Sequence, residues 1–395
     1  MKRIAAEYIY TLESFAPLCN AFVEFDEDGT IVRTGLCENP EKEAVFYKGA
    51  IVPGFVNAHC HIELSHLQGK FVKGSGMAGF IDQINALRDS SCREERIGLV
   101  SKWMDILWNQ GVSAMGDISN CDESFTVKSK SPLYTRTFLE VFGTEPDDAP
   151  SIMESVRDLQ RKASAMGIDA APVPHSCYTM SPELLTASAA DALKSGFLSY
   201  HSQESPEEEE MLLSGSGALY DNRKKAGMSI PPVTGKPSLM YFIDRLSEVH
   251  PAPFDENILL VHEVCLTEEA ADAAKEVMNN LFIALCPMSN LFINNQLPPV
   301  LLMRNKGLKL TLGTDSLSCN DTLDMVREMY CLQHSFPDIP FGEILSWACI
   351  NGAEFLGKSD ILGSVVPGKK PGLVLVDHLD SSGQLTEKSR SARIV

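Results

Sequence analysis

The chain has 395 residues, of which 44% are hydrophobic, which is enough to fill the core of one large domain and of a small second one. Its 53 aspartate and glutamate residues outnumber 34 lysine and arginine residues, so the formal net charge is −19 at pH 7. This composition excludes collagen-like, disordered and disulfide-stapled classes, and the charge argues against nucleic acids and anionic membranes as partners.

The first residues and the cysteines bear on where the protein is located. In 1-MKRIAAEYIYTLESF-15, Glu7 interrupts the apolar run after a basic start, and no continuous apolar stretch is long enough to span a bilayer. The eleven cysteines are scattered without a C-x-x-C pair, and several lie in apolar runs. We therefore expect a cytoplasmic protein with free thiols, without disulfides or a zinc site of the cysteine type.

Both ends of the chain predict short β-strands. In 21-AFVEFDEDGTIVRTG-35, two apolar-rich arms flank the turn sequence 26-DEDG-29, which is typical of a β-hairpin. Near the other end, 361-ILGSVVPGKKPGLVLVD-377 places Pro-Gly pairs before an apolar strand. We expect the two ends to pair into one small β domain, because chain termini commonly lie close together.

Between the ends, strand-like apolar runs alternate with helical segments. The predicted strands are 51–59, 112–118, 136–142, 169–175, 197–201, 258–262, 281–286 and 308–315. The predicted helices between them include 78–91, 98–111, 151–167 and 267–280. Eight strands that alternate with helices favour an α/β fold of the (β/α)8 TIM-barrel type, whereas six would favour a doubly wound sheet.

One connection is much longer than a single strand-to-helix unit needs. It lies between His201 and His262 and contains 206-PEEEEML-212 and 226-AGMSIPPVTGKPSLMYF-242. Long insertions on a barrel form lids or subunit contacts, and on this ground we expect a homodimer. We interpret the run Glu207 to Glu210 as a solvated helix start, because carboxylates are stabilised at the positive end of the helix dipole.

Histidine or aspartate residues end several of the predicted strands. His59 and His61 are two positions apart, so that on a strand both imidazoles lie on one face. The runs 171-APVPH-175, 198-LSYH-201, 258-ILLVH-262 and 311-TLGTD-315 end in the same way. One such pair can arise by chance, but these strand ends together predict side chains that meet over one end of the sheet or barrel. His, His, His and Asp around an open position are the composition of a catalytic metal site.

Seven motifs, in order along the chain, resemble the amidohydrolase superfamily. The resemblance is to its branch of metal-dependent aminohydrolases, which contains methylthioadenosine/S-adenosylhomocysteine deaminases and aminodeoxyfutalosine deaminases. The motifs are PGFVNAHCH (53–61), PVPHSCYTMSPELL (172–185), HSQE (201–204), LLVHEVCL (259–266), CPMSNLF (286–292), GTDSLSCNDTLDM (313–325) and GKKPGLVLVD (368–377). The extended HIELSHLQGK (61–70) is most similar to aminodeoxyfutalosine deaminases. The resemblance implies a barrel over 53–358 and a small β-sandwich domain built from 1–52 and 359–395.

The resemblance also implies a set of metal ligands. His59, His61 and His201 would ligate a divalent metal ion, with Asp315 as the fourth protein ligand. Binuclear relatives use a carboxylated lysine after the fourth strand, and 171-APVPHSCY-178 contains no lysine. We therefore expect one metal ion, Zn²⁺ in the first place, although this set of ligands also accepts Fe²⁺.

Three more residues receive roles from the same resemblance. Glu204 corresponds to the family's proton-shuttling glutamate, His262 to the histidine that polarises the substrate, and His175 to a substrate-contacting histidine. The implied reaction is hydrolytic deamination of an adenine nucleoside modified at its 5′ side. The residues fit this chemistry, because a Lewis acid lowers the pKa of water to roughly 7, Asp315 and His262 can hold the released proton, and Glu204 can protonate the ring and then the amino group.

The loop that follows His59 and His61 offers further candidates for contact with the substrate. Glu63, Ser65 and His66 would bind the ribose or its substituent, with surface decoration as the alternative. Arg88, on the following helix, would suit a substrate carboxylate, but we favour an exposed helix residue. Cys60 is expected to point into the core, because strand alternation sends it to the face opposite the two histidines.

Two later segments carry polar residues just past strand ends. They are Ser289 and Asn290, and Ser318 and Asn320, and we expect them to line the pocket that binds a small-molecule substrate.

Three other functions compete with deamination of an adenine nucleoside. The same site could act on guanine, on cytosine or on a ring that bears chlorine or an amide, and pocket residues would decide among these. A non-catalytic binding protein would have no use for an acid/base residue such as Glu204, three positions after a ligand. In a structural zinc site, four Cys or His ligands usually occupy all coordination positions of the metal. Here an aspartate and further titratable groups surround the expected open coordination position.

Overall fold

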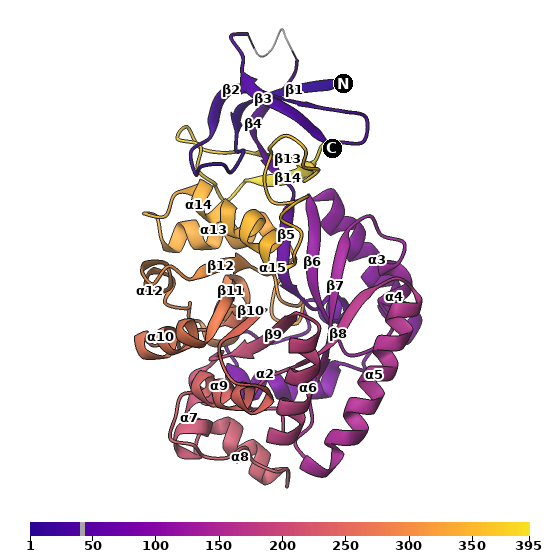
Figure 1. The fold of residues 1–395 in the computed structure, drawn as a ribbon, viewed down its shortest axis with the longest axis vertical. Helices are drawn as coiled ribbons and strands as arrows, with labels where there is room; N and C mark the ends of the chain where they lie inside the picture. Colours follow the sequence, from indigo (N-terminus) through magenta and orange to yellow (C-terminus); the bar gives the residue numbers. More distant parts are fainter. Residues whose placement is uncertain (40–43) are drawn as a thin grey trace.

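The computed structural model describes residues 1–39 and 44–395, and in these residues the strands form one six-stranded sheet and two four-stranded sheets (Figure 1). The strands are β1 (Lys2–Ile9), β2 (Leu18–Phe25), β3 (Ile31–Leu36), β4 (Val45–Pro53), β5 (Phe55–Cys60), β6 (Val112–Ser119), β7 (Tyr134–Val141), β8 (Asp169–Pro174), β9 (Phe197–Ser202), β10 (Phe254–His262), β11 (Met278–Leu285), β12 (Lys309–Leu312), β13 (Leu373–Asp377) and β14 (Arg390–Arg393).

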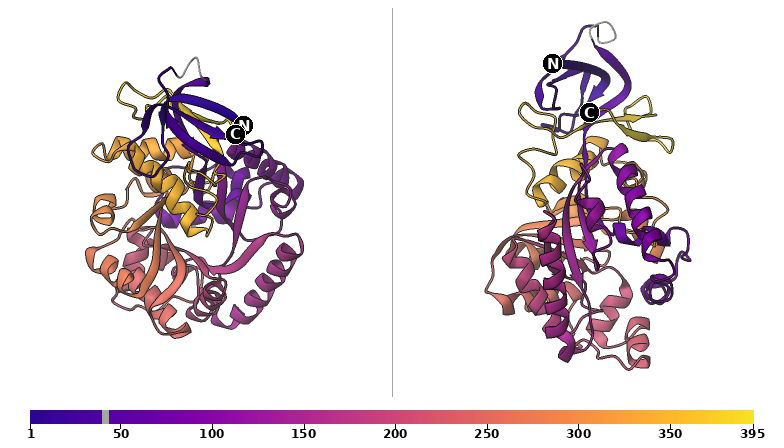
Figure 2. Two further views of the ribbon diagram at one scale, coloured as in Figure 1. Left: turned by 45° about the horizontal axis from the view of Figure 1, so that its top comes forward. Right: turned by 90° about the vertical axis from the view of Figure 1, so that its right-hand side faces the viewer.

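The six-stranded sheet is built from both ends of the chain, and its strand order is β14-β13-β4-β1-β2-β3. Figure 2 shows both termini on this part of the molecule. β2 and β3 form the predicted antiparallel hairpin, in which Phe22 lies opposite Gly35. β13 comes from the other end of the chain and pairs antiparallel with β4, with Val374 opposite Val52. The prediction that the two ends of the chain pair with each other is therefore confirmed, since their strands form one sheet.

The predicted strand over 51–59 is two strands in the structure, and Gly54 separates them. β4 ends directly before this glycine in the six-stranded sheet, and β5 begins directly after it in a four-stranded sheet. A Cβ atom on Gly54 would lie 2.0 Å from Ser113 Oγ and 2.4 Å from the carbonyl oxygen of Pro371. Only glycine fits where the chain passes between the two sheets, and the apolar pattern does not mark this break.

The two four-stranded sheets are parallel, with strand orders β5-β6-β7-β8 and β12-β11-β10-β9. Hydrogen bonds join the two sheets at both seams, near the carboxyl ends of the strands. At one seam the backbone N–H of His201 donates to the carbonyl oxygen of His175 over 3.0 Å. At the other, the N–H groups of Thr314 and Asp315 donate to the carbonyl oxygen of His59 over 3.1 and 3.0 Å. The carboxyl ends of strands from both sheets therefore lie together.

Helices alternate with the parallel strands, as predicted. The helices are α2 (Gly76–Leu87), α3 (Arg93–Asn109), α4 (Phe125–Lys128), α5 (Ala149–Ala165), α6 (Pro182–Lys194), α7 (Pro206–Ser214), α8 (Ala218–Lys225), α9 (Ser238–Val249), α10 (Glu268–Val277), α11 (Pro287–Asn294), α12 (Val300–Asn305), α13 (Met325–Ser335), α14 (Phe341–Ser346) and α15 (Gly352–Phe355). α3, α5 and α6 pack beside β6, β7 and β8, and α10 packs beside β11 (Figure 1). The four predicted helices are present as α2, α3, α5 and α10.

The long connection between β9 and β10 contains α7, α8 and α9. α7 and α8 both contact α2, which follows the first parallel strand. The insertion therefore reaches the loop side of the parallel strands, where the predicted site lies. No helix in the part of the chain that the structure describes is both long and apolar enough to cross a membrane.

Candidate active site

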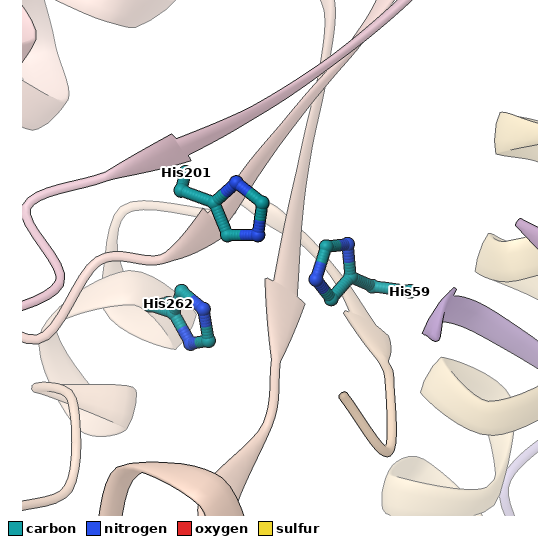
Figure 3. Close-up of side chains that lie close together, drawn as sticks. All are labelled: His59, His201 and His262. Atoms are coloured by element: carbon teal, nitrogen blue, oxygen red, sulfur yellow. The ribbon is translucent and has the colours of Figure 1, made fainter. Parts of the chain in front are cut away.

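Five buried side chains meet where the parallel strands end: His59, His61, His201, His262 and Asp315. His59 Nε2 lies 3.2 Å from His61 Nε2, and Asp315 Oδ1 lies 3.9 and 3.6 Å from these two nitrogens. The ring centroids of His59 and His201 are 4.8 Å apart. Figure 3 shows His201 and His262 facing His59. The structure thus brings the four predicted metal ligands and His262 into one cluster.

The backbone at this cluster has an unusual conformation. His262 has φ of 79° and Asp315 has φ of 57°, in the left-handed region that residues other than glycine seldom adopt. Such conformations cost about 1–3 kcal/mol each and persist where the surroundings hold them. Cys60, between His59 and His61, is fully buried in the apolar core, as predicted.

The donor atoms of the cluster fit a divalent metal ion. Burial lowers the pKa of His61 to about 3 and that of His262 to about 4, and it also lowers the pKa of His59 and His201, so the imidazoles are neutral. The candidate ligand atoms of His59, His61 and Asp315 lie within 4.8 Å of one another. Neutral imidazole nitrogens and a carboxylate oxygen that converge in this way are the donors that Zn²⁺ binds in proteins.

Glu204 lies beside the cluster, after β9. Its Oε1 is 3.3 Å from His262 Nε2, and its Oε2 accepts a hydrogen bond from the Tyr178 hydroxyl at 2.8 Å. Burial raises the pKa of Glu204 to about 7. The Glu204 carbonyl oxygen also accepts a bond from Asn294 Nδ2 at 3.1 Å, so both its side chain and its backbone are held.

The run Glu207 to Glu210 is not the solvated helix start that the sequence predicted, because three of its carboxylates hold the site loops. Glu208 is fully buried and accepts the backbone N–H groups of Gln203 and Glu204 at 3.1 and 2.8 Å. Glu207 accepts the N–H of Ala78 in α2, and Glu209 accepts both the N–H and the hydroxyl of Ser238. Only Glu210 of the four is exposed. A run of charged residues in the sequence does not show which of their side chains accept hydrogen bonds from distant backbone groups.

Ser289 and Asn290 were expected to line the pocket, and they instead support two residues of the cluster. The Ser289 hydroxyl donates to Asp315 Oδ2 over 2.6 Å. The Asn290 amide bonds to Nδ1 of His262 over 3.0 Å. Both residues are fully buried and neither lines the cavity described below. They fix the orientation of the carboxylate and of the imidazole.

A cavity opens over the cluster. Its polar wall includes His61, His175, His201, Glu204, His262, Asp315 and Ser318, so that His175 and Ser318 lie where substrate contact was predicted. Its apolar wall includes Leu64, Met77, Phe80, Ile84 and Phe142. Asn320 lies outside the cavity and donates from Nδ2 to Glu328 over 2.7 Å. The cavity therefore combines a polar floor with an apolar mouth, as small-molecule sites commonly do.

The loop that follows His59 and His61 is held by hydrogen bonds within the protein, and few of its polar groups face the cavity. Both carboxylate oxygens of Glu63 accept the N–H of Asn120 at 3.0 Å. Ser65 Oγ donates to the carbonyl oxygen of Ile62 over 2.7 Å, and His66 Nε2 bonds to that of Arg88 over 2.8 Å. Glu63, Ser65 and His66 do not line the cavity, so the predicted contact of Glu63 with the ribose does not match its placement.

The residues that line the cavity without having been assigned to it from the sequence include Asn120, Glu140 and Phe142. Arg88 was expected to be exposed, but it is half-buried and lines the cavity with its guanidinium 5.6 Å from the centre of the Phe142 ring. Glu140 is a charged residue near the end of the strand-like run 136-RTFLEVF-142, and this signal could have revealed it.

Behind the cluster, a buried ion pair between Lys128 and Asp117 supports the turn after His61. Both side chains are fully buried, and Asp117 Oδ1 accepts the N–H of Ile62 at 2.9 Å. The lysine thus lies beneath the floor of the site and outside the cavity.

Comparisons with known proteins agree with this architecture. A sequence profile described as the amidohydrolase family matches residues 50–394. A protein of Desulfitobacterium hafniense named 5-methylthioadenosine/S-adenosylhomocysteine deaminase is 26% identical over 339 residues, which are 83% of this chain and 72% of that protein.

Two solved structures share the fold. The crystal structure of Helicobacter pylori aminofutalosine deaminase in complex with methylthio-coformycin matches with a TM-score of 0.81 and 21% identity, over 100% of both chains. The structure of an adenosine deaminase from Xanthomonas campestris with bound zinc matches with a TM-score of 0.72 and 20% identity, over 98% of this chain and 86% of the other.

Proposed function

The chain belongs to the amidohydrolase family, and from this membership and the geometry of the site we propose that it is a metal-dependent hydrolytic deaminase of an adenine-type nucleoside modified at its 5′ side. The observation that carries the proposal is a buried carboxylate, Glu204, which faces the cavity beside the cluster of histidines and Asp315. The names of the Desulfitobacterium, Helicobacter and Xanthomonas proteins, all deaminases, support this class of reaction.

In this proposal, His59, His61, His201 and Asp315 hold one divalent metal ion. When bound, the ion supplies a Lewis acid that lowers the pKa of water, so that hydroxide is available near neutral pH. We propose Zn²⁺, with Fe²⁺ as the alternative, because imidazole and carboxylate donors suit both and because the Xanthomonas structure holds zinc.

The other residues of the cluster handle protons. Glu204, whose pKa burial raises to about 7, can bind and release a proton at neutral pH. It gives its proton to a ring nitrogen while the oxygen of water bonds to the amino-bearing carbon, and the resulting carboxylate takes the second proton of water from the added hydroxyl group and delivers it to the amino group. His262 and Asp315, whose side chains lie 3.8 Å apart, hold the first proton that water loses and return it to Glu204 at the end of the reaction. The carbon–nitrogen bond breaks, ammonia leaves, and a carbonyl group remains on the ring.

Arg88 and Phe142 favour a substrate whose 5′ substituent carries a carboxylate. The guanidinium of Arg88 lines the cavity, and within residues 1–39 and 44–395 no hydrogen bond or ion pair engages it. An apolar wall with one free cation matches an apolar substituent that ends in an anion, as in aminodeoxyfutalosine, and S-adenosylhomocysteine also offers a carboxylate, beside an ammonium group. 5′-Methylthioadenosine has a neutral substituent and would form no ion pair with Arg88.

The Arg88→Gln variant should therefore change substrate preference. We expect kcat/KM for S-adenosylhomocysteine or aminodeoxyfutalosine to fall by about 10- to 100-fold, the value of a hydrogen bond to a charged group, and kcat/KM for 5′-methylthioadenosine to change by less than about threefold. Ammonia release measured over a range of substrate concentrations checks this. An equal loss for neutral and anionic substrates would show that Arg88 does not contact a carboxylate.

We propose that the two parallel sheets form one closed (β/α)8 barrel over 53–358, and that 1–52 and 359–395 form the small β-sandwich domain. The hydrogen bonds from His201 to His175 and from Asp315 to His59 at the two seams support closure. A crystal structure in which β8 and β9, or β12 and β5, were separated by water or by side chains would contradict it.

The first test of the function is ammonia release by the metal-loaded protein from adenosine, 5′-methylthioadenosine, S-adenosylhomocysteine, aminodeoxyfutalosine, guanine and cytosine, with metal analysis of the same sample. We expect release from at least one of the adenine nucleosides and one metal ion per chain. If ammonia were released from guanine or cytosine alone, that heterocycle would replace the adenine nucleoside as the proposed substrate. If no compound released ammonia, the result would contradict deamination.

A further inference from the structure

Glu140 lines the cavity but has no task in the proposed reaction. It lies near the end of β7 and is 7% exposed. Its Oε2 accepts a hydrogen bond from Asn120 Nδ2 at 3.2 Å. Its Oε1 is buried and has no hydrogen-bond partner among the residues that the structure describes. A buried acceptor without a partner is unfavourable, so a ligand that donates a hydrogen bond to it would gain affinity.

Glu140 lies beside His175 and His201 on the wall of the cavity. Oε1 of Glu140 lies 3.5 Å from His201 Nδ1 and 3.8 Å from His175 Nε2. Glu204 and Asp315 instead approach His262, at 3.3 and 3.8 Å from its Nε2. Glu140 therefore contacts His175 and His201, whereas Glu204 contacts His262, so the two carboxyl groups lie beside different histidines of the cavity wall.

Neighbouring groups already satisfy the histidines beside Glu140. His201 Nδ1 lies closer to the carbonyl oxygen of His175, at 3.2 Å, than to Glu140, and a neutral imidazole has one N–H to donate. His175 Nδ1 bonds to the Ser176 and Thr179 hydroxyls at 2.7 and 2.9 Å. The free oxygen of Glu140 therefore faces the cavity as an acceptor that these rings do not saturate.

We propose that Glu140 accepts hydrogen bonds from the hydroxyl groups of the substrate's sugar and so determines specificity for ribonucleosides. This inference rests on the proposed function. With Glu204 at the base, the donors on the sugar of an adenine nucleoside modified at its 5′ position are the 2′ and 3′ hydroxyls, and an unpartnered carboxyl oxygen accepts such hydrogen bonds.

The test compares 5′-methylthioadenosine with its 2′-deoxy and 3′-deoxy analogues. This substrate is neutral, so Arg88 does not contribute to the comparison. We expect the wild-type protein to prefer the ribonucleoside in kcat/KM by about 10- to 100-fold over at least one analogue, and the Glu140→Gln variant to lose most of this preference. Calorimetric binding of inosine against 2′-deoxyinosine and 3′-deoxyinosine should give the same result without turnover. Glu154→Gln, an exposed glutamate of α5, is the matched control and should keep the preference.

The other outcomes separate failure of the inference from failure of the function. Ammonia release from 5′-methylthioadenosine without a preference over both analogues would overturn the role of Glu140 and leave the deaminase standing. An equal loss on all three substrates in Glu140→Gln, or a loss of metal, would also overturn it, because Glu140 would then act by positioning His201. No release from any adenine nucleoside would remove the proposed function and this inference with it.

Discussion

The Glu204→Gln variant is expected to bind metal as the wild-type protein does and to lose about 10²- to 10⁴-fold in kcat, the range that general acid–base groups contribute. Gln keeps the size of the side chain and can still accept the hydrogen bond from the Tyr178 hydroxyl, but it cannot carry a proton to the ring or to the amino group. Because Glu204 is not one of the four proposed ligands, the metal should stay in place.

Single-turnover and steady-state ammonia release, with metal analysis of the same preparation, measure this effect. Glu210→Gln is a matched control, because Glu210 lies on the following helix, is exposed and does not line the cavity. Its kcat should stay within about twofold of the wild-type value, as is usual for surface changes away from a site. A Glu204→Gln variant that kept most of its activity would remove the proposed proton transfer, whatever its metal content.

The convergence of the site could be predicted because each cluster residue follows a buried strand. His59, His201, His262 and Asp315 end apolar runs, and parallel strands of neighbouring sheets present their carboxyl ends at the same edge. Spacing along the chain and strand polarity therefore place these residues together. The separate strands β4 and β5 were not predicted, because the steric reason for the break at Gly54 lies in Ser113 and Pro371, far along the chain.

The residues around the cluster were harder to predict, because their roles depend on which partner they meet. Ser289 and Asn290 follow a strand as pocket residues do, but their side chains turn to Asp315 and His262. Glu63 lies two positions after His61 in the sequence, yet it accepts a hydrogen bond from a backbone N–H of the neighbouring loop. Glu208 is part of a charge run, yet it is buried under Glu204. Sequence neighbours and charge patterns carry no information on such contacts between distant segments.

The His59→Ala variant is expected to lose more than about 100-fold in metal affinity, because even residues that only support metal ligands contribute about 10- to 100-fold. His59 is central to the cluster: its Nε2 lies 3.2 Å from that of His61 and 3.9 Å from Asp315 Oδ1. Titration of the purified protein against a competing chelator measures the affinity, and ammonia release should be lost in parallel. The His334→Ala variant, which removes an exposed histidine of α13, should bind metal normally.

Because His59 is fully buried, its truncation also leaves a cavity, and the loss of metal has to be separated from misfolding. Wild-type protein treated with a chelator keeps every side chain and should lose activity, which added Zn²⁺ should restore. His59→Ala should instead keep its cooperative unfolding transition and should not recover activity with Zn²⁺ at the concentration that restores the wild-type protein. If the variant bound one metal ion with wild-type affinity, His59 would not be a ligand. If the wild-type protein stayed fully active after complete metal removal, the reaction would not depend on this cluster as a metal site, and Glu204 would have to act on a substrate without it.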